Sequence, residues 1–266
     1  MLPRMRFLIS LFCFSCSVLA AESGPLVIVG GGGTPLAVRQ HFVKLAGGKA
    51  ARIAVLPQAS SREDRGQSSV KMFSELGAKV FIDELKNPEA ARTQLKEATA
   101  IWFPGGSQAV LYEALEKSGL VKYIRDRHAQ GLPIAGTSAG AAVMSAVMIP
   151  AMPKKPGLRA SNTPTTPGLG LAPGLIIDQH FIARRRMNRL LSAVLDHPGY
   201  IGVGIGEATA IIVRGKRFTV MGENSVIVID PSAAKQTHPA KGKLQSATGL
   251  RLHVLKAGHE YLFGGK

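Results

Sequence analysis

The chain has almost no cysteine. It contains two, Cys13 and Cys16, and both lie within the first 21 of its 266 residues. Without that segment the chain has no disulfide, no thiol nucleophile and no thiolate metal site. The roughly 245 residues that remain are enough to bury a core without covalent staples. We therefore expect a single domain over residues 22–266.

Acidic residues are also scarce. Seventeen Asp and Glu stand against 33 Lys and Arg, for a formal charge of +16, and removing Arg4 and Arg6 leaves +14. Such an excess suits anionic partners. The basic residues are scattered, however, and the densest cluster, Arg184–Arg186, has no interleaved aromatics. We expect a solvated basic surface and no nucleic-acid partner.

Long apolar runs are absent apart from one near the start. Phe7–Leu19 follows Arg4 and Arg6 and precedes small residues at positions 20 and 21. A transmembrane helix needs about 20 apolar residues, so this run is too short to be one. The layout predicts a secretory signal peptide over 1–21, hence an exported protein, periplasmic or secreted, with no stable membrane insertion after signal removal. Lipidation is disfavoured because neither cysteine follows a convincing small-residue lipobox.

Short apolar strands alternate with helical patterns through the first half of the chain. Strands are expected near 26–29, 51–56, 79–82, 100–103 and 132–135, with helices between them over 68–76, 88–98, 107–116 and 120–130. Continuous apolar strands of this kind indicate a mostly parallel sheet covered on both faces, so the fold class is α/β. From residue 201 the chain becomes β-rich, and these antiparallel strands are expected to complete the same sheet.

The stretch Gly136-Thr137-Ser138-Ala139-Gly140 follows a predicted strand and precedes a run compatible with a helix. It matches the G-x-S-x-G pattern of a nucleophile elbow, in which a sharp turn presents the serine at the carboxyl end of the sheet. The alternative is a tight turn of small residues with no chemistry. In the first interpretation Ser138 is a nucleophile and the amide of Ala139 is one oxyanion donor.

A serine nucleophile needs a base and a group that orients the base. Of seven histidines, His180 alone lies between an apolar strand, Ile176–Ile177, and a helical segment, at the expected carboxyl edge of the sheet. Glu207 stands among apolar strand residues, where an acid is costly unless it is paired, and a histidine would pair it. The alternatives are a structural histidine and a glutamate that caps a turn.

Two glycine-rich turns remain. The run of residues 30–33 resembles a dinucleotide loop, but Pro35 occupies the last required glycine position, and no acid ends the second strand, so nucleotide binding is rejected. Phe103–Gln108 ends a strand on the serine's edge. The amide of Gly106 can therefore be the second oxyanion donor and Gln108 can reach a substrate, unless the segment is an ordinary strand-to-helix turn.

Taken together, "GTSAGA" (136–141), "DQHF" (178–181) with "RRRMNRL" (184–190), and "GIGEATA" (204–210) resemble the cyanophycinase-like serine peptidases, a family that includes dipeptidase E. The likeness extends from "LVIVGGGG" to "LHVLKAG", nearly the whole mature chain. It implies a fold like that of class I glutamine amidotransferases, with a serine in place of their cysteine; amidotransferase activity is disfavoured for that reason. It also implies a Ser138–His180–Glu207 triad, no metal, no cofactor and a homodimer as a compatible state.

The resemblance further implies a set of substrate-binding residues: Gln108, Asp178, Gln179, Arg184, Arg186 and Arg189. A helix is expected from Phe181 to Leu195, with Arg184 near its apolar arc and Arg186 and Arg189 on the opposite side. Arg184 is then a candidate for gripping an acidic substrate group, or else a structural partner of Asp178. The sequence departs from the family at Gly206, where an acid is common, and over 149–166, which does not align with it.

Cyanophycin is a poly-aspartate that carries an arginine on each β-carboxyl, and enzymes of this family release β-Asp-Arg dipeptides from it. The resemblance thus implies a serine exopeptidase acting on cyanophycin, and the predicted signal peptide makes it an exported one. Two rivals stay open: a related peptidase for other aspartyl or isoaspartyl peptides, and a non-catalytic exported peptide-binding protein.

Overall fold

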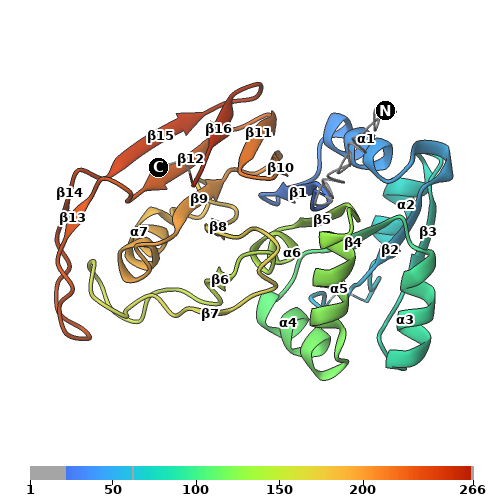
Figure 1. Cartoon of the computed structure of the whole chain (residues 1–266), viewed down its shortest axis with the longest axis horizontal. Helices are drawn as coiled ribbons and strands as arrows, with labels where there is room; N and C mark the ends of the chain where they lie inside the picture. The colour runs from blue at the N-terminus through green and yellow to red at the C-terminus, as the bar shows by residue number, and fades with distance from the viewer. Residues whose placement is uncertain (1–21, 62, 265–266) are drawn as a thin grey trace, which may run out of the picture.

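The computed structural model describes residues 22–61 and 63–264, so the predicted signal peptide lies outside the described residues. Two larger β-sheets with helices around them form most of the described part of the molecule (Figure 1). No helix among the described residues is long and apolar enough to cross a membrane.

The larger sheet has eight strands in the order β16-β11-β10-β1-β5-β4-β2-β3. Its parallel half is formed by β1 Leu26–Val29, β2 Arg52–Val55, β3 Lys79–Ile82, β4 Ala100–Phe103 and β5 Ile134–Thr137. Its antiparallel half is formed by β10 Thr209–Arg214, β11 Arg217–Gly222 and β16 Glu260–Leu262. Because the central strands are parallel, their carboxyl ends meet at one edge of the sheet.

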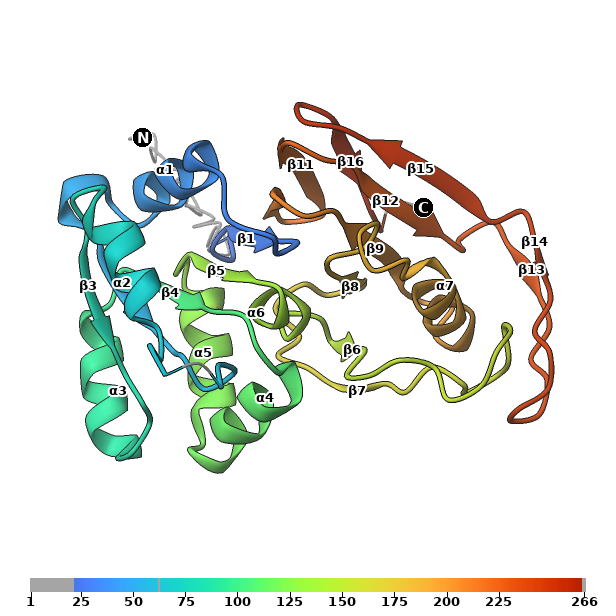
Figure 2. The ribbon, with the colours of Figure 1, turned by 180° about the vertical axis from the view of Figure 1, so that it is seen from behind.

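Helices cover this sheet on both faces because its central strands are apolar on both sides. One face packs on α1 Leu36–Leu45 and α2 Gln67–Ser74, and strand residues such as Val27 and Val29 point into that core. The other face packs on α3 Pro88–Glu97, α4 Gln108–Lys117, α5 Leu120–Ala129 and the short α6 Ala139–Ala142. Figure 2 shows the helices of the parallel half gathered on one side of the molecule. The prediction of an α/β fold is confirmed.

The C-terminal strands do not all complete the large sheet, and this part of the prediction was wrong. A second sheet, in the order β15-β12-β9-β8, is built from β8 Leu175–Asp178, β9 Ile201–Ile205, β12 Val226–Asp230 and β15 Arg251–Leu255. One of its faces shares the core of α3 to α6, through residues such as Ile177 and Val203, and α7 Met187–Asp196 covers the other through Leu190 and Val194. The chain crosses from the second sheet to the first between β9 and β10.

The remaining elements are short. They are the 3-10 turn η1 Gly48–Ala50, the pair β6 Val147–Met148 with β7 Thr166–Pro167, and the pair β13 Lys235–Gln236 with β14 Ala247–Thr248. The stretch between β6 and β7 lies within residues 149–166, the segment that departs from the family pattern in the sequence. It runs beside α7 (Figure 1).

Candidate active site

Ser138 occupies a strained turn between β5 and α6. Its φ of 55° and ψ of −114° are rare for a residue with a side chain. A Cβ on Gly136 would lie 2.5 Å from the carbonyl oxygen of Gly140, and one on Gly140 would lie 2.1 Å from that of Phe103. The two glycines are therefore required for the turn to close. This is the strand–turn–helix geometry expected of a nucleophile elbow.

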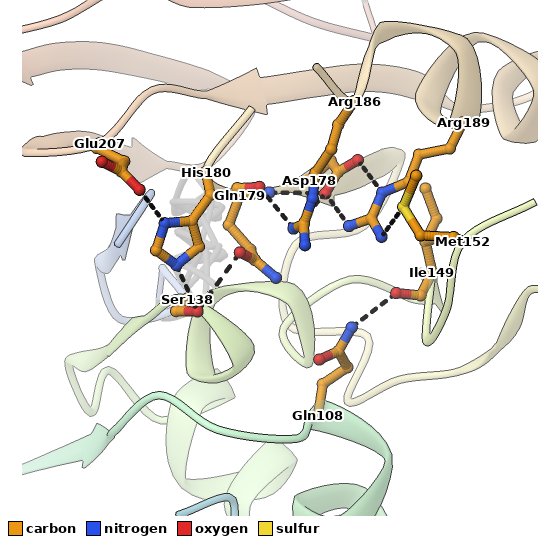
Figure 3. Close-up of polar contacts among 10 residues, drawn as sticks. All are labelled: Gln108, Ser138, Ile149, Met152, Asp178, Gln179, His180, Arg186, Arg189 and Glu207. Carbon is orange, nitrogen blue, oxygen red and sulfur yellow. Dashed lines mark hydrogen bonds and ion pairs between the residues drawn. The ribbon is translucent and has the colours of Figure 1, made fainter. Parts of the chain in front are cut away.

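His180 and Glu207 reach Ser138 from the second sheet. His180 follows β8, and its Nε2 lies 3.0 Å from the Oγ of Ser138. Glu207 lies in the link from β9 to β10, and its Oε1 is 2.5 Å from the Nδ1 of the same ring. Figure 3 shows the three side chains in one line. With Nδ1–H donating to the carboxylate, Nε2 is left as an acceptor for the serine hydroxyl proton.

The histidine is largely buried, whereas the glutamate is more exposed to solvent: the side chain of His180 is 10% exposed and that of Glu207 is 38% exposed. Burial lowers the pKa of His180 below its ordinary 6.5; the hydrogen bond that the ring donates to Glu207 opposes this, and the positive charge of Arg184 adds to it. The imidazole is therefore neutral at neutral pH, as a general base must be.

A pH profile tests this electrostatic arrangement. The active form has a neutral imidazole, so kcat/KM is expected to be full above pH 6.5 and to be lost as the pH falls through a lower pKa. Arg184→Gln removes a charge that lowers this pKa, so the acid limb should move to higher pH. An acid limb at or above 6.5 in the unmodified protein would contradict the assignment of His180 as a buried base.

The glycine run after β1 supports both partners of the serine. The carbonyl of Gly30 accepts a hydrogen bond from the amide of His180 at 2.7 Å, and that of Gly31 accepts one from Ala208 at 2.8 Å. A Cβ on Gly31 would lie 2.4 Å from the Nε2 of His180, and one on Gly32 2.5 Å from the Cβ of Glu207. The sequence interpretation rejected nucleotide binding here but missed this role, for which four successive glycines at a strand end were the signal.

Gly31→Ala should strongly lower the rate of hydrolysis without unfolding the protein. The added methyl would displace the imidazole, and a shift of about 1 Å at a catalytic group costs on the order of 100-fold in rate. Gly33→Ala is the matched control: its φ of +102° resembles the +91° of Gly31, but its Cβ would meet nothing within 4 Å. Steady-state kinetics and thermal melts of both variants make the comparison. Equal losses of activity in the two would show that backbone strain, and not the imidazole, is responsible.

Two backbone amides lie beside the serine. Ala139 is the first residue of α6, and Gly106 follows β4 with a φ of +139°. A Cβ on Gly105 would be 3.4 Å from the Cβ of Ser138, so this turn packs directly against the nucleophile. Over residues 22–61 and 63–264, neither amide donates a hydrogen bond to another residue. Both are therefore available to an oxyanion, and their role as its donors stays a prediction.

A cleft of about 430 Å³ opens beside the serine. Its floor includes Ser138, His180 and Gly106, and its far wall is formed by the loop after β2 and the start of α2, including Ser61 and Asp64. The cleft is large enough for a substrate side chain. Among the described residues, no group of three His, Cys, Asp or Glu side chains could hold a metal ion.

The two predicted glutamines flank the other side of the serine. The Oε1 of Gln179 lies 3.4 Å from the Oγ of Ser138. Gln108 is buried, and its Nε2 donates to the carbonyl of Ile149 at 2.7 Å, which ties the segment after β6 to the site (Figure 3). Contact of either glutamine with substrate stays a prediction.

Asp178 is enclosed by the arginines. Its Oδ2 accepts from the Nε of Arg189 at 2.7 Å, its Oδ1 contacts the Nη2 of Arg189, and the Nη1 of Arg186 lies 3.4 Å from Oδ1. Burial, followed by the charge of Arg189, lowers the pKa of Arg186 to about 10, so it stays charged. The Asp178 side chain is 1% exposed. The expectation that it faces the substrate is corrected: it supports Gln179 from behind, because its Oδ1 accepts a hydrogen bond from the backbone N–H of Gln179 at 2.8 Å.

The expected orientation of the arginines was also wrong. The helix begins at Met187, and residues 181–186 form turns in which Arg185 has a φ of 50°. Phe181 fills the space over Gly204, where a Cβ would be 2.4 Å from its ring, and the positive φ of His180, 48°, and of Arg185 interrupt the expected helix. As a result Arg184 is exposed, while Arg186 and Arg189 are buried.

Asp178→Asn should destabilise the protein strongly. It leaves two buried guanidinium groups without a counter-charge, which typically costs about 3–5 kcal/mol of unfolding free energy. Asp126→Asn is the control, because its ion pair with Lys122 is exposed and such pairs contribute less than about 1 kcal/mol. Urea unfolding measures both. A loss for Asp178→Asn no larger than that of the control would show that the arginines do not depend on this carboxylate.

A strained serine on a strand–helix turn, contacted by a histidine that contacts a carboxylate, is the arrangement of a serine hydrolase on an α/β fold. Comparison with known proteins agrees. A model of peptidase family S51 matches residues 26–221. A cyanophycinase from Trichormus variabilis is 37% identical over 237 residues, covering 84% of this chain and 79% of that protein. A cyanophycinase from Thermosynechococcus vestitus is 32% identical over 257 residues, covering 91% and 80%.

Among solved structures, a peptidase from an acI-B1 Actinobacterium has a TM-score of 0.68 at 23% identity, covering 92% of this chain and 98% of that one, and supports the fold. The chain belongs to peptidase family S51 and is a serine-type peptidase. The family resemblance inferred from the sequence motifs is confirmed.

Proposed function

We propose that the protein is an exopeptidase that hydrolyses cyanophycin to β-Asp-Arg dipeptides through Ser138, His180 and Glu207. The observation that carries the proposal is the line of three side chains, joined at 3.0 Å and 2.5 Å, in a chain related to cyanophycinases over most of its length.

In the proposed mechanism, the Nε2 of His180 takes the proton of Ser138 as Oγ attacks the scissile carbonyl carbon. The amides of Ala139 and Gly106 hold the resulting oxyanion, and Glu207 stabilises the imidazolium. Collapse of the tetrahedral intermediate breaks the C–N bond, and His180 gives its proton to the departing amine. Water then repeats the sequence on the acyl-enzyme, with His180 again as the base, and restores the serine.

Incubation with purified cyanophycin, followed by identification of soluble products by mass spectrometry, tests the substrate. Release of β-Asp-Arg supports the proposal. Gly206 and the segment 149–166 depart from the family, so a panel of short α- and β-aspartyl peptides belongs in the same assay. Hydrolysis of those peptides without release from cyanophycin would replace the proposed substrate with aspartyl or isoaspartyl peptides.

We also propose export, which is supported by the sequence pattern of residues 1–21. The intact mass of protein recovered from the periplasm or medium of an expressing bacterium tests it. Cleavage after Ala21 supports the proposal, and an uncleaved chain retained in the cytoplasm contradicts it. Homodimer formation stays a prediction.

A further inference from the structure

A second hollow, of about 380 Å³, lies between α7 and the segment that follows β6. Its lining includes four basic side chains and no acidic one: Lys154, Lys155, Arg185 and Arg189. Over residues 22–61 and 63–264, no carboxylate lies within ion-pair distance of either lysine or of Arg185. Like charges gathered without a counter-ion attract an anion.

The backbone that carries the lysines is fixed in place. Asn162 is buried, and its side chain accepts from the amide of Lys155 at 3.0 Å and donates to the carbonyl of the same residue at 2.7 Å. Its own carbonyl accepts from the amide of Lys154 at 3.2 Å. On the opposite wall, Arg185 holds a left-handed φ of 50°, a strained conformation that is enriched at ligand clamps. The hollow is therefore built in advance of any ligand.

A continuous set of contacts links the lining of the hollow to the catalytic serine. The Nη1 of Arg189 lies 3.5 Å from the Sδ of Met152, a residue of the lysine segment, and Gln108 holds the start of that segment at Ile149. Figure 3 shows Met152 and Arg189 at the end of a row of side chains that runs from Ser138 through Gln179 and Asp178. Because these contacts connect the lining of the hollow with the residues around Ser138, we take a neighbouring unit of an extended substrate as its candidate ligand.

We propose that Lys154, Lys155 and Arg185 form a subsite for the free carboxylates of substrate units next to the scissile bond. The inference rests on the proposed function, because each arginine of cyanophycin leaves one α-carboxylate free. Arginine pairs with a carboxylate through two parallel hydrogen bonds, and lysines add point charges. The subsite selects a polymer of such units over a short neutral peptide.

Binding of a soluble oligomer of four β-Asp-Arg units to the Ser138→Ala protein tests the proposal by calorimetry, without turnover. Adding Lys154→Gln/Lys155→Gln should raise Kd about tenfold. Arg185→Asn should also raise it, and asparagine tolerates the left-handed φ. Lys117→Gln/Lys122→Gln removes the same charge from exposed sites on α4 and α5 and should leave Kd within about twofold.

An oligomer with amidated arginine carboxyls identifies the ligand group. It should bind the Ser138→Ala protein about tenfold more weakly than the free acid and should lose nothing further in the lysine double variant. Equal Kd values for Lys154→Gln/Lys155→Gln and its control, or equal binding of the two oligomers, would overturn the subsite alone. Absence of both binding and cleavage of the acid oligomer by the unmodified chain would overturn the proposed function as well. Thermal melts establish that each variant is folded.

Discussion

Ser138→Ala is expected to lower the rate of peptide hydrolysis by about 10⁵–10⁶-fold, because loss of a triad nucleophile leaves only the oxyanion donors and substrate binding. No acyl-enzyme can form. Substrate affinity should be kept, because the substitution removes only one small hydroxyl from the lining of the cleft. The measurement is single-turnover release of dipeptide from cyanophycin, with calorimetric binding in parallel.

Ser61→Ala is the control for that variant. Ser61 lines the same cleft but, over the described part of the chain, has no histidine within hydrogen-bond distance, so its loss should leave most of the activity. Removal of a triad nucleophile abolishes nearly all of the rate. Retention of more than about 1% of the rate by Ser138→Ala would therefore show that Ser138 is not the nucleophile.

Glu207→Gln is expected to lower kcat by about 10³-fold. The amide keeps the shape of the side chain but removes the charge that stabilises the imidazolium. The loss should be smaller than for a fully enclosed acid, because the Glu207 side chain is 38% exposed and water screens its charge. The hydrogen bond to Glu207 and the charge of that carboxylate raise the pKa of His180, so removing the charge should also move the acid limb of the pH profile further below 6.5.

Glu223→Gln makes the same charge change next to the same turn. The amide of Glu223 donates to the carbonyl of Ala208 at 2.9 Å, and its side chain is exposed. It should alter neither kcat nor the acid limb appreciably. A Glu207→Gln enzyme with an unchanged pH profile would mean that this carboxylate does not act on His180.

The parallel half of the fold could be predicted from the sequence, because its strands are short apolar runs and its helices have clear periodicity. The start of α4 illustrates this: Ser107 caps it by accepting from the amide of Val110, as a serine before a helical run suggests. The choice of sheet for each C-terminal strand could not be predicted. The second sheet is also covered on both faces, so its strands, with residues such as Val203 and Val228, are as apolar as those of the large sheet. The local pattern of apolar residues does not say with which strand each of them pairs.

The catalytic residues could be predicted because each has a reactive side chain at the end of a predicted strand. Ser138, His180 and Glu207 lie at such ends, and the structure brings them together. The arginines were harder, because a helical projection from residue 181 assumes a continuous helix, whereas Arg185 has a left-handed φ and the helix begins only at Met187. The four successive glycines after β1 indicated a close approach, but the groups that approach, His180 and Glu207, could not be predicted because they lie about 150 or more positions away.

Reaction with a fluorophosphonate, followed by peptide mapping, tests most directly whether an activated serine works at this site. The account predicts one adduct, on Ser138, that forms with the unmodified protein and fails to form with His180→Ala. An adduct on another residue, or labelling of Ser138 at the same rate without the imidazole, would contradict it.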